Sequence, residues 1–144
     1  MNLVDTFLKL ISIESETGKE DNILDFIETF LEGNNFQGEI KRNNGGIVAV
    51  PSESSKKIAL VGHVDTVPIV PNQQYKFDND DLIGGRGSVD MKGGIAVILH
   101  SLIENSSEIV GVFYTAEESS YEDNGLNIIM PVSYTHLTLP TSHL

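Results

Sequence analysis

The chain has 144 residues, 40% of them hydrophobic, which is enough for the core of one ordinary domain and excludes a disordered chain. Its formal charge of −12 argues against nucleic acid as a partner, because such a partner requires a basic surface. It has no cysteine, so disulfides and thiolate metal sites are excluded, and any metal ligand has to be His, Asp or Glu.

The N-terminus shows no basic stretch followed by an apolar segment and a cleavage site, so we expect no signal peptide. The longest apolar run is too short to span a bilayer. These observations predict a soluble, cytoplasmic protein.

The first third of the chain predicts two helices and then two strands. Apolar residues at helical spacing predict an amphipathic helix over residues 2–12 and a second helix that begins near Ile23 and ends at Gly33. Residues 36–42 and 45–51 predict two strands joined by an Asn-Asn-Gly-Gly turn.

The rest of the chain predicts strands that alternate with helices. Residues 57–63 are almost entirely apolar, as expected for a strand covered on both faces. Residues 67–88 predict a loop with up to two short strands, and residues 91–105 a helix. A second buried strand is expected over 108–118 and a further helix over 124–130. The order predicts an α/β fold with a mixed, largely parallel central sheet and helices on both faces.

The last segment does not fit this pattern. The stretch from Val132 to Thr141 has no charge and neither helical nor strand periodicity, and its sequence matches one reading frame of a transposase end used in sequencing libraries. We therefore expect residues 1–131 to be the natural protein and residues 132–144 to be a non-native, adapter-like tail, which is left out of fold reasoning together with its two histidines.

Three segments carry the chemistry: "GHVDTVP", "GGRGSVDMKGG" and "YTAEES". The first and third lie at the carboxyl ends of the two apolar strands, where ligands bind in open α/β sheets. His63, Asp90 and one of the adjacent Glu117 and Glu118 therefore form a candidate ligand set for a divalent metal. His100 lies in an apolar helical run, so we interpret it as structural.

Neighbouring residues suggest how such a site would work, although each motif alone has an ordinary explanation. Asp65 is placed to accept the second ring N–H of His63, and one of the paired glutamates can bind metal while the other accepts a proton. A lone His-x-Asp is common, paired acids also begin helices, and glycine-rich stretches are usually turns. Arg86 and Lys92 are either surface charges or groups that position Asp90 and substrate. The glycine-rich segment lacks the order of a phosphate loop, which disfavours a flavodoxin-like or nucleotide-binding domain.

Taken together, these motifs resemble, in order and spacing, the three N-terminal signatures of the aminoacylase, carboxypeptidase and desuccinylase family of zinc-dependent hydrolases. The resemblance runs from Leu3 to Met130 and, with the later "YEDNGL", is most similar to the succinyl-diaminopimelate desuccinylases. Acetylornithine deacetylases and di- or tripeptidases share the first two motifs.

The resemblance implies two divalent metal ions, zinc first and cobalt as an alternative. It implies that His63 binds one metal, that Asp90 bridges both and that Glu118 binds the other. Asp65 would orient His63, and Glu117 would be the general base and later the proton donor. A cis peptide bond is implied directly after the bridging acid.

The implied function is amide hydrolysis of an N-acylated amino acid, with N-succinyl-diaminopimelate giving succinate and diaminopimelate in lysine and cell-wall biosynthesis. The implied partners are this small molecule or a short peptide, and a second subunit bound through a lid domain, with neither nucleic acid nor membrane. The family also uses a further acid, the lid and a late histidine, so we expect an incomplete phosphorylase/hydrolase-like catalytic domain that is inactive by itself. A non-catalytic binding domain with the same fold is the alternative from another class.

Overall fold

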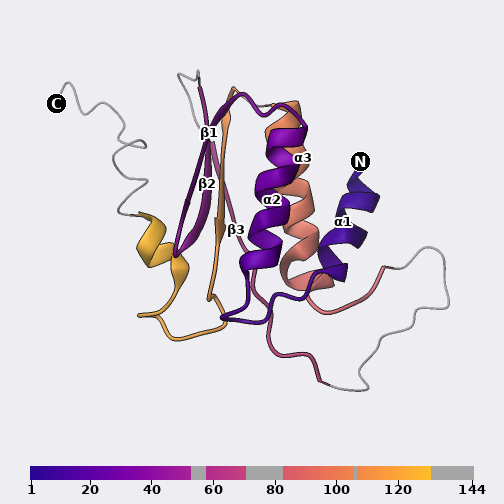
Figure 1. The fold of residues 1–144 in the computed structure, drawn as a ribbon, viewed down its shortest axis with the longest axis vertical. Coiled ribbons are helices and arrows are strands. Elements are labelled where there is room, and N and C mark those ends of the chain that lie inside the picture. Colours follow the sequence, from indigo (N-terminus) through magenta and orange to yellow (C-terminus); the bar gives the residue numbers. More distant parts are fainter. Residues whose placement is uncertain (53–57, 71–82, 106, 131–144) are drawn as a thin grey trace.

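The computed structural model describes residues 1–52, 58–70, 83–105 and 107–130, which form one sheet with helices against it (Figure 1). The centre of the expected loop and the expected tail, residues 132–144, lie outside these ranges. Within them, no helix is both long enough and apolar enough to cross a membrane.

The expected helices and strands are confirmed, with boundaries that shift by a few residues. The helices are α1 (Leu3–Ser12), α2 (Asp21–Gly33) and α3 (Gly93–Glu104). The strands are β1 (Gly38–Asn43), β2 (Gly46–Pro51), β3 (Ile58–His63) and β4 (Ile109–Tyr114). A short π-helical turn, η1 (Ser88–Lys92), precedes α3, and residues 125–130 are again α-helical. α3 begins at Gly93, later than expected, because the backbone angles of Asp90 and Met91 are not helical.

The four described strands lie in the order β1-β2-β4-β3. β1 pairs antiparallel with β2, β2 antiparallel with β4, and β3 parallel with β4. The expected mixed sheet is confirmed, but the described part is not largely parallel, because β2 pairs antiparallel with both of its neighbours. β3 lies at the edge of the described sheet, and Ile58 and Val61 are 61% and 44% exposed, unlike the expected strand covered on both faces. An apolar sequence predicts that a strand tends to be buried but does not say which element covers it. Among the described residues no strand pairs with this edge, so these side chains are exposed.

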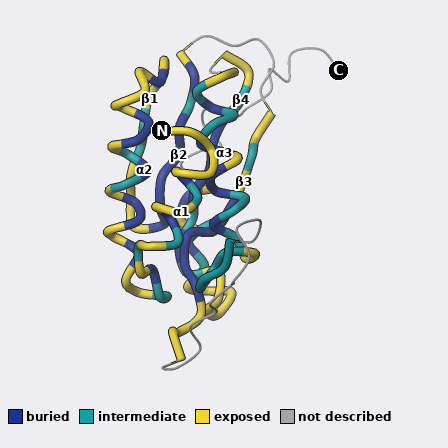
Figure 2. The backbone as a smooth tube through the Cα atoms, turned by 90° about the vertical axis from the view of Figure 1, so that its right-hand side faces the viewer, coloured by how far each residue is buried: buried dark blue, intermediate teal, exposed yellow. Residues whose placement is uncertain are grey.

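Helices cover both faces of the sheet, as expected. α1, α2 and α3 lie on one face, and the helical residues 125–130 lie on the other (Figure 1). The larger core includes the fully buried Ile27, Leu99 and Phe113, and the buried stretches of the helices and strands are dark blue in Figure 2. A smaller cluster on the second face joins β2 and β4 to Ile129.

His100 has the structural role that its apolar surroundings indicate. Its Nε2 atom lies 2.9 Å from the hydroxyl oxygen of the buried Thr6 on α1, and its ring centroid lies 5.5 Å from that of Phe30 on α2. The Asn2 side chain caps the start of α1 by accepting from the backbone N–H of Asp5 at 2.8 Å. His100 therefore ties α3 to two other helices, away from the ends of the strands.

The core between α3 and the sheet predicts a large effect of a single truncation. Leu99→Ala removes a fully buried side chain, so we expect the free energy of unfolding to fall by about 2–5 kcal/mol in urea denaturation. Val97→Ala, on the same helix at a position that is 52% exposed, is the control and should cost less than about 1 kcal/mol. Equal losses in both variants would contradict the packing described here.

Candidate functional site

The site is built where the two parallel strands end. His63 is the last residue of β3 and is paired in register with Tyr114, the last residue of β4. The backbone N–H of Val64 still donates to the carbonyl oxygen of Tyr114 at 2.9 Å. Because parallel strands end at the same edge, the residues that follow β3 and β4 are brought together although about fifty positions separate them in sequence.

The carboxylate of Asp65 connects these two loops. Its Oδ1 atom accepts from the backbone N–H of Glu117 at 3.0 Å, and its Oδ2 atom accepts from that of Glu118 at 3.1 Å and from the Thr17 hydroxyl at 2.9 Å. Burial, with 1% of the residue exposed, acts to raise its pKa. The hydrogen bonds with His63, with the two backbone N–H groups and with Thr17 outweigh burial and lower the pKa of Asp65 to about 2.

His63 lies between two acids. Its Nδ1 atom is 3.3 Å from Asp65 Oδ1 and 3.1 Å from the Asp65 carbonyl oxygen, and its Nε2 atom is 2.8 Å from Asp90 Oδ1. Burial of the ring acts to lower its pKa, but the hydrogen bonds and charges of Asp65 and Asp90 outweigh burial and raise the pKa of His63 to about 9. The imidazole is thus fixed from both sides, with one neighbour buried and the other, Asp90, 73% exposed at its side chain.

Hydrogen bonds of Lys92 hold the turn that carries Asp90. The peptide bond between Asp90 and Met91 is cis, as the resemblance implies. Lys92 is only 2% exposed, its ammonium donates to the carbonyl oxygen of Ile13 at 2.6 Å, and its backbone N–H donates to that of Gly87 at 2.8 Å. Burial lowers the pKa of Lys92 to about 8. The sequence left two interpretations of Lys92, a surface charge or a group that positions Asp90 and substrate. Its burial excludes the surface charge.

The acids of the second and third motifs line one cavity. Asp90 and Glu118, with Arg86 and Val67, are among the residues around a cavity of about 360 Å³. Across the described part of the chain, no three or more His, Asp or Glu side chains are arranged so as to hold a single ion. The structure thus brings His63 and Asp90 into contact and places Glu118 on the same cavity as Asp90, without a complete ligand set.

Residues 15–20, between α1 and α2, also contribute to the site, although their sequence indicates only a break between two helices. Ser15 Oγ donates to the carbonyl oxygen of Val64 at 2.8 Å, and Glu20 Oε1 accepts from the backbone N–H of Ala116 at 3.2 Å. Short polar residues around a glycine are typical of any turn. The sequence therefore holds no signal that would separate this segment from an ordinary loop.

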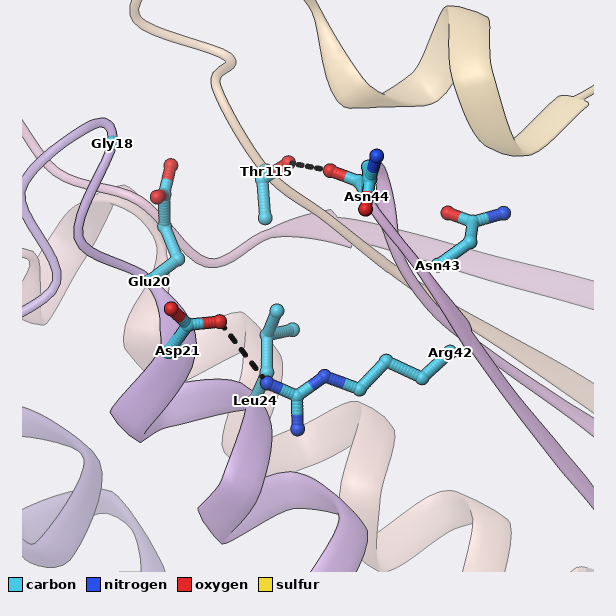
Figure 3. A pocket seen from close by; sticks show the side chains of 8 residues that line it. All are labelled: Gly18, Glu20, Asp21, Leu24, Arg42, Asn43, Asn44 and Thr115. Atoms are coloured by element: carbon cyan, nitrogen blue, oxygen red, sulfur yellow. Dashed lines mark hydrogen bonds and ion pairs between the residues drawn. The ribbon is translucent and has the colours of Figure 1, made fainter.

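A larger cavity of about 520 Å³ lies beside Thr115 and Glu20 (Figure 3). Its basic member, Arg42, is already paired: its guanidinium lies 3.2 Å from Asp21 Oδ1 and 3.1 Å from Glu28 Oε2. These acids are carried by α2, so the ion pairs join α2 to β1. The only motif residue around this cavity is Thr115, and we do not place the chemistry here.

The fold and this edge of the sheet define a mixed α/β protein with a candidate site beyond its strand ends, and comparison with known proteins identifies its family. The sequence profile of peptidase family M20/M25/M40 matches residues 59–134. A putative succinyl-diaminopimelate desuccinylase DapE of Mycobacterium tuberculosis is 40% identical over 124 residues, which are 83% of this chain and 35% of the relative. The chain belongs to peptidase family M20/M25/M40.

Other relatives are hydrolases as well. The succinyl-diaminopimelate desuccinylase of Corynebacterium glutamicum is 35% identical over 129 residues, covering 84% of this chain and 35% of the relative. A putative LysW-lysine/LysW-ornithine hydrolase of Pyrococcus abyssi is 35% identical over 114 residues, which are 78% of this chain and 32% of the relative. The chain thus spans about a third of the length of the curated relatives that it matches.

Solved structures share the fold. The M20 family metallo-carboxypeptidase Sso-CP2 of Sulfolobus solfataricus superimposes with a TM-score of 0.71 over 96% of this chain and 36% of that protein, at 18% identity. The Bacillus subtilis YXEP protein, described as a dinuclear metal binding peptidase, superimposes with a TM-score of 0.58 over 87% of this chain and 39% of that protein, at 20% identity. The α/β fold expected from the sequence is confirmed.

The hydrogen bonds of Asp65 predict a strong effect of a nearly isosteric change. Asp65→Asn replaces one acceptor oxygen with an amide that faces N–H or hydroxyl donors, so we expect the free energy of unfolding at neutral pH to fall by about 2–4 kcal/mol. Asp5→Asn, at an exposed position, makes the same chemical change and should cost less than about 1 kcal/mol. Urea denaturation monitored by circular dichroism measures both, and an unaffected Asp65→Asn protein would contradict the hydrogen-bonded geometry.

Proposed function

We propose that the full gene product containing this chain is a metal-dependent amidohydrolase that cleaves the amide bond of an N-acylated amino acid. The observation that carries the proposal is the 2.8 Å contact between His63 Nε2 and Asp90 Oδ1 at the edge of the sheet where β3 and β4 end. Beside this contact, Asp65 holds the backbone of the paired Glu117 and Glu118. Imidazole and carboxylate groups from three separate segments are therefore gathered at one edge.

We assign His63, Asp90 and Glu118 as ligands of two divalent metal ions, zinc first and cobalt as the alternative. The donor chemistry fits, because borderline divalent ions take imidazole nitrogen and carboxylate oxygen. His63 also has the usual feature of a metal-binding histidine, since its second ring nitrogen faces the buried carboxylate of Asp65. The remaining ligands are expected from sequence beyond the described residues.

The residues of this chain would then divide the work of hydrolysis. When bound, the metal ions supply Lewis-acid chemistry that polarises the amide carbonyl. Glu117 takes a proton from the water that attacks the carbonyl carbon and delivers it to the amide nitrogen, so that the C–N bond breaks to give a carboxylate and an amine. Asp65 keeps the backbone of Glu117 in place during both transfers. Arg86 lines the cavity of about 360 Å³ that Asp90 and Glu118 also line, and its positive charge can attract a negatively charged acyl group.

N-succinyl-diaminopimelate is the substrate that we propose first, because two relatives at 40% and 35% identity over most of this chain are described as succinyl-diaminopimelate desuccinylases. N-acetylornithine and di- or tripeptides are the alternatives, since a LysW-lysine/LysW-ornithine hydrolase and carboxypeptidases also match this chain. Pairing of subunits through a lid domain and a cytoplasmic location are part of the same proposal. The division into a catalytic part, residues 1–131, and a non-native tail, residues 132–144, stays a prediction.

The proposed base gives a direct test of catalysis against the alternative of a non-catalytic binding domain. In the full gene product supplied with zinc, Glu117→Gln should lower kcat by about 10²–10⁴-fold, because the amide cannot accept the proton of water. Metal binding measured by calorimetry should persist, since Glu117 is not an assigned ligand. Glu122→Gln, an exposed acid of the same segment, is the matched control and should keep parental activity. Undiminished turnover by Glu117→Gln would remove Glu117 from this role.

A substrate panel tests the finer assignment. With zinc or cobalt added, kcat/KM for N-succinyl-diaminopimelate should exceed that for N-acetylornithine and for dipeptides by about tenfold or more, equivalent to about 1.4 kcal/mol of transition-state binding. A chelator should abolish turnover of every substrate, and added metal should restore it. Preference for acetylornithine or for a dipeptide would retain the amidohydrolase and replace the desuccinylase.

A further inference from the structure

Three consecutive backbone N–H groups at the start of the third motif are all bound by carboxylates. Asp65 accepts from Glu117 and Glu118, and Glu20 Oε1 accepts from Ala116 at 3.2 Å. Hydrogen bonds to ionised acceptors are roughly twice as strong as neutral ones. Two acids from distant parts of the chain therefore fix the backbone from which the proposed base and a proposed ligand extend.

The backbone at Ala116 needs such support. Its φ angle is 56°, in the left-handed region that residues with a side chain rarely adopt. A conformation of this kind persists where the surroundings enforce it. Ala116 directly precedes Glu117, so a return to an ordinary backbone conformation would redirect the chain that carries both glutamates.

Glu20 is well suited to enforce the conformation because its own position is fixed. It is 8% exposed and lies immediately before α2, whose first turns place Ile23 and Leu24 in the core at 0% and 4% exposure. In Figure 3, its carboxylate extends from the start of α2 toward the loop at Thr115. Thr17, three residues earlier, donates a hydrogen bond from its hydroxyl to Asp65. The same short segment therefore contacts both Asp65 and the backbone of Ala116.

We propose that Glu20 is a positioning residue, whose carboxylate acts with that of Asp65 to set the backbone of residues 116–118 and hence the placement of the Glu117 and Glu118 carboxylates. This inference deepens the proposed function and rests on it for its catalytic meaning. Glu20 touches neither substrate nor metal in this assignment. It acts only through the Ala116 amide.

Amide hydrogen exchange in the full gene product tests the geometry without requiring activity. Glu20→Ala should speed exchange of the Ala116 amide by about tenfold or more, because its acceptor is gone. Glu20→Gln keeps an acceptor oxygen and should stay within about threefold of the parent. Glu32→Ala removes the same charge from an exposed position of α2 and should leave the Ala116 amide unchanged.

Steady-state kinetics test the consequence. Glu20→Ala should lower kcat by about ten- to a hundredfold while KM changes by less than about threefold, because the displaced group acts in the chemical step. Glu20→Gln should restore most of kcat, which a loss of overall stability would not explain. Should Glu20→Ala lack a cooperative unfolding transition, Glu20→Asp, which retains the charge but shortens the reach, should show the same two effects at smaller size.

The outcomes separate this inference from the proposed function. Unchanged exchange at Ala116 in Glu20→Ala, or faster exchange with parental kcat, overturns the positioning role while leaving the amidohydrolase intact. A metal-loaded parent that hydrolyses no N-acyl amino acid or peptide overturns the proposed function, and the exchange data then still decide whether Glu20 fixes residues 116–118. Faster exchange together with a selective fall in kcat and rescue by Gln supports the inference.

Discussion

The buried carboxylate of Asp65 is the interaction on which the arrangement of the site depends. A charge removed from water is tolerated only when hydrogen bonds replace its hydration, and Asp65 meets this condition with two backbone N–H groups, a hydroxyl and an imidazole. These partners come from three places: the segment between α1 and α2, the end of β3, and the loop after β4. Satisfying one charge therefore fixes the relative positions of Thr17, His63 and the Glu117–Glu118 pair, which belong to three segments that are distant in sequence.

The sheet makes this concentration of contacts possible. Parallel pairing of β3 with β4 puts Asp65 and the paired glutamates at one edge, while packing of α3 against both strands holds the turn with Asp90 against the same edge. Lys92 joins the turn that carries Asp90 to the end of α1, because its buried ammonium donates to the carbonyl oxygen of Ile13. The site is thus assembled from rigid elements, whereas the Asp90 side chain itself stays largely exposed.

Sequence reasoning located the elements and the chemistry-bearing residues because both follow from local patterns. Apolar periodicity predicted the strands, and the rule that ligands lie beyond strand ends predicted that His63 and the paired glutamates meet at one edge. Asp90, which does not directly follow a strand, was a candidate because of its chemistry. Sequence reasoning could not locate Glu20, because its acceptor role depends on the φ angle of Ala116, nearly a hundred residues away in sequence. Nor did it place β3 at an edge, since the apolar content of a strand is independent of how many neighbours pair with it.

The residues of the candidate site differ in how deeply they are buried. His63 and Asp65 are almost fully enclosed, and their contacts are complete within the described residues. Asp90 and Glu118 line a cavity with no third acid or histidine arranged to share an ion with them in that part of the chain. Val61, two residues before His63 on β3, is 44% exposed, and no strand among the described residues pairs with this edge. The chain spans about a third of the curated relatives that it matches, and Asp90, which ends the contacts of His63 on the solvent side, has a side chain that is 73% exposed.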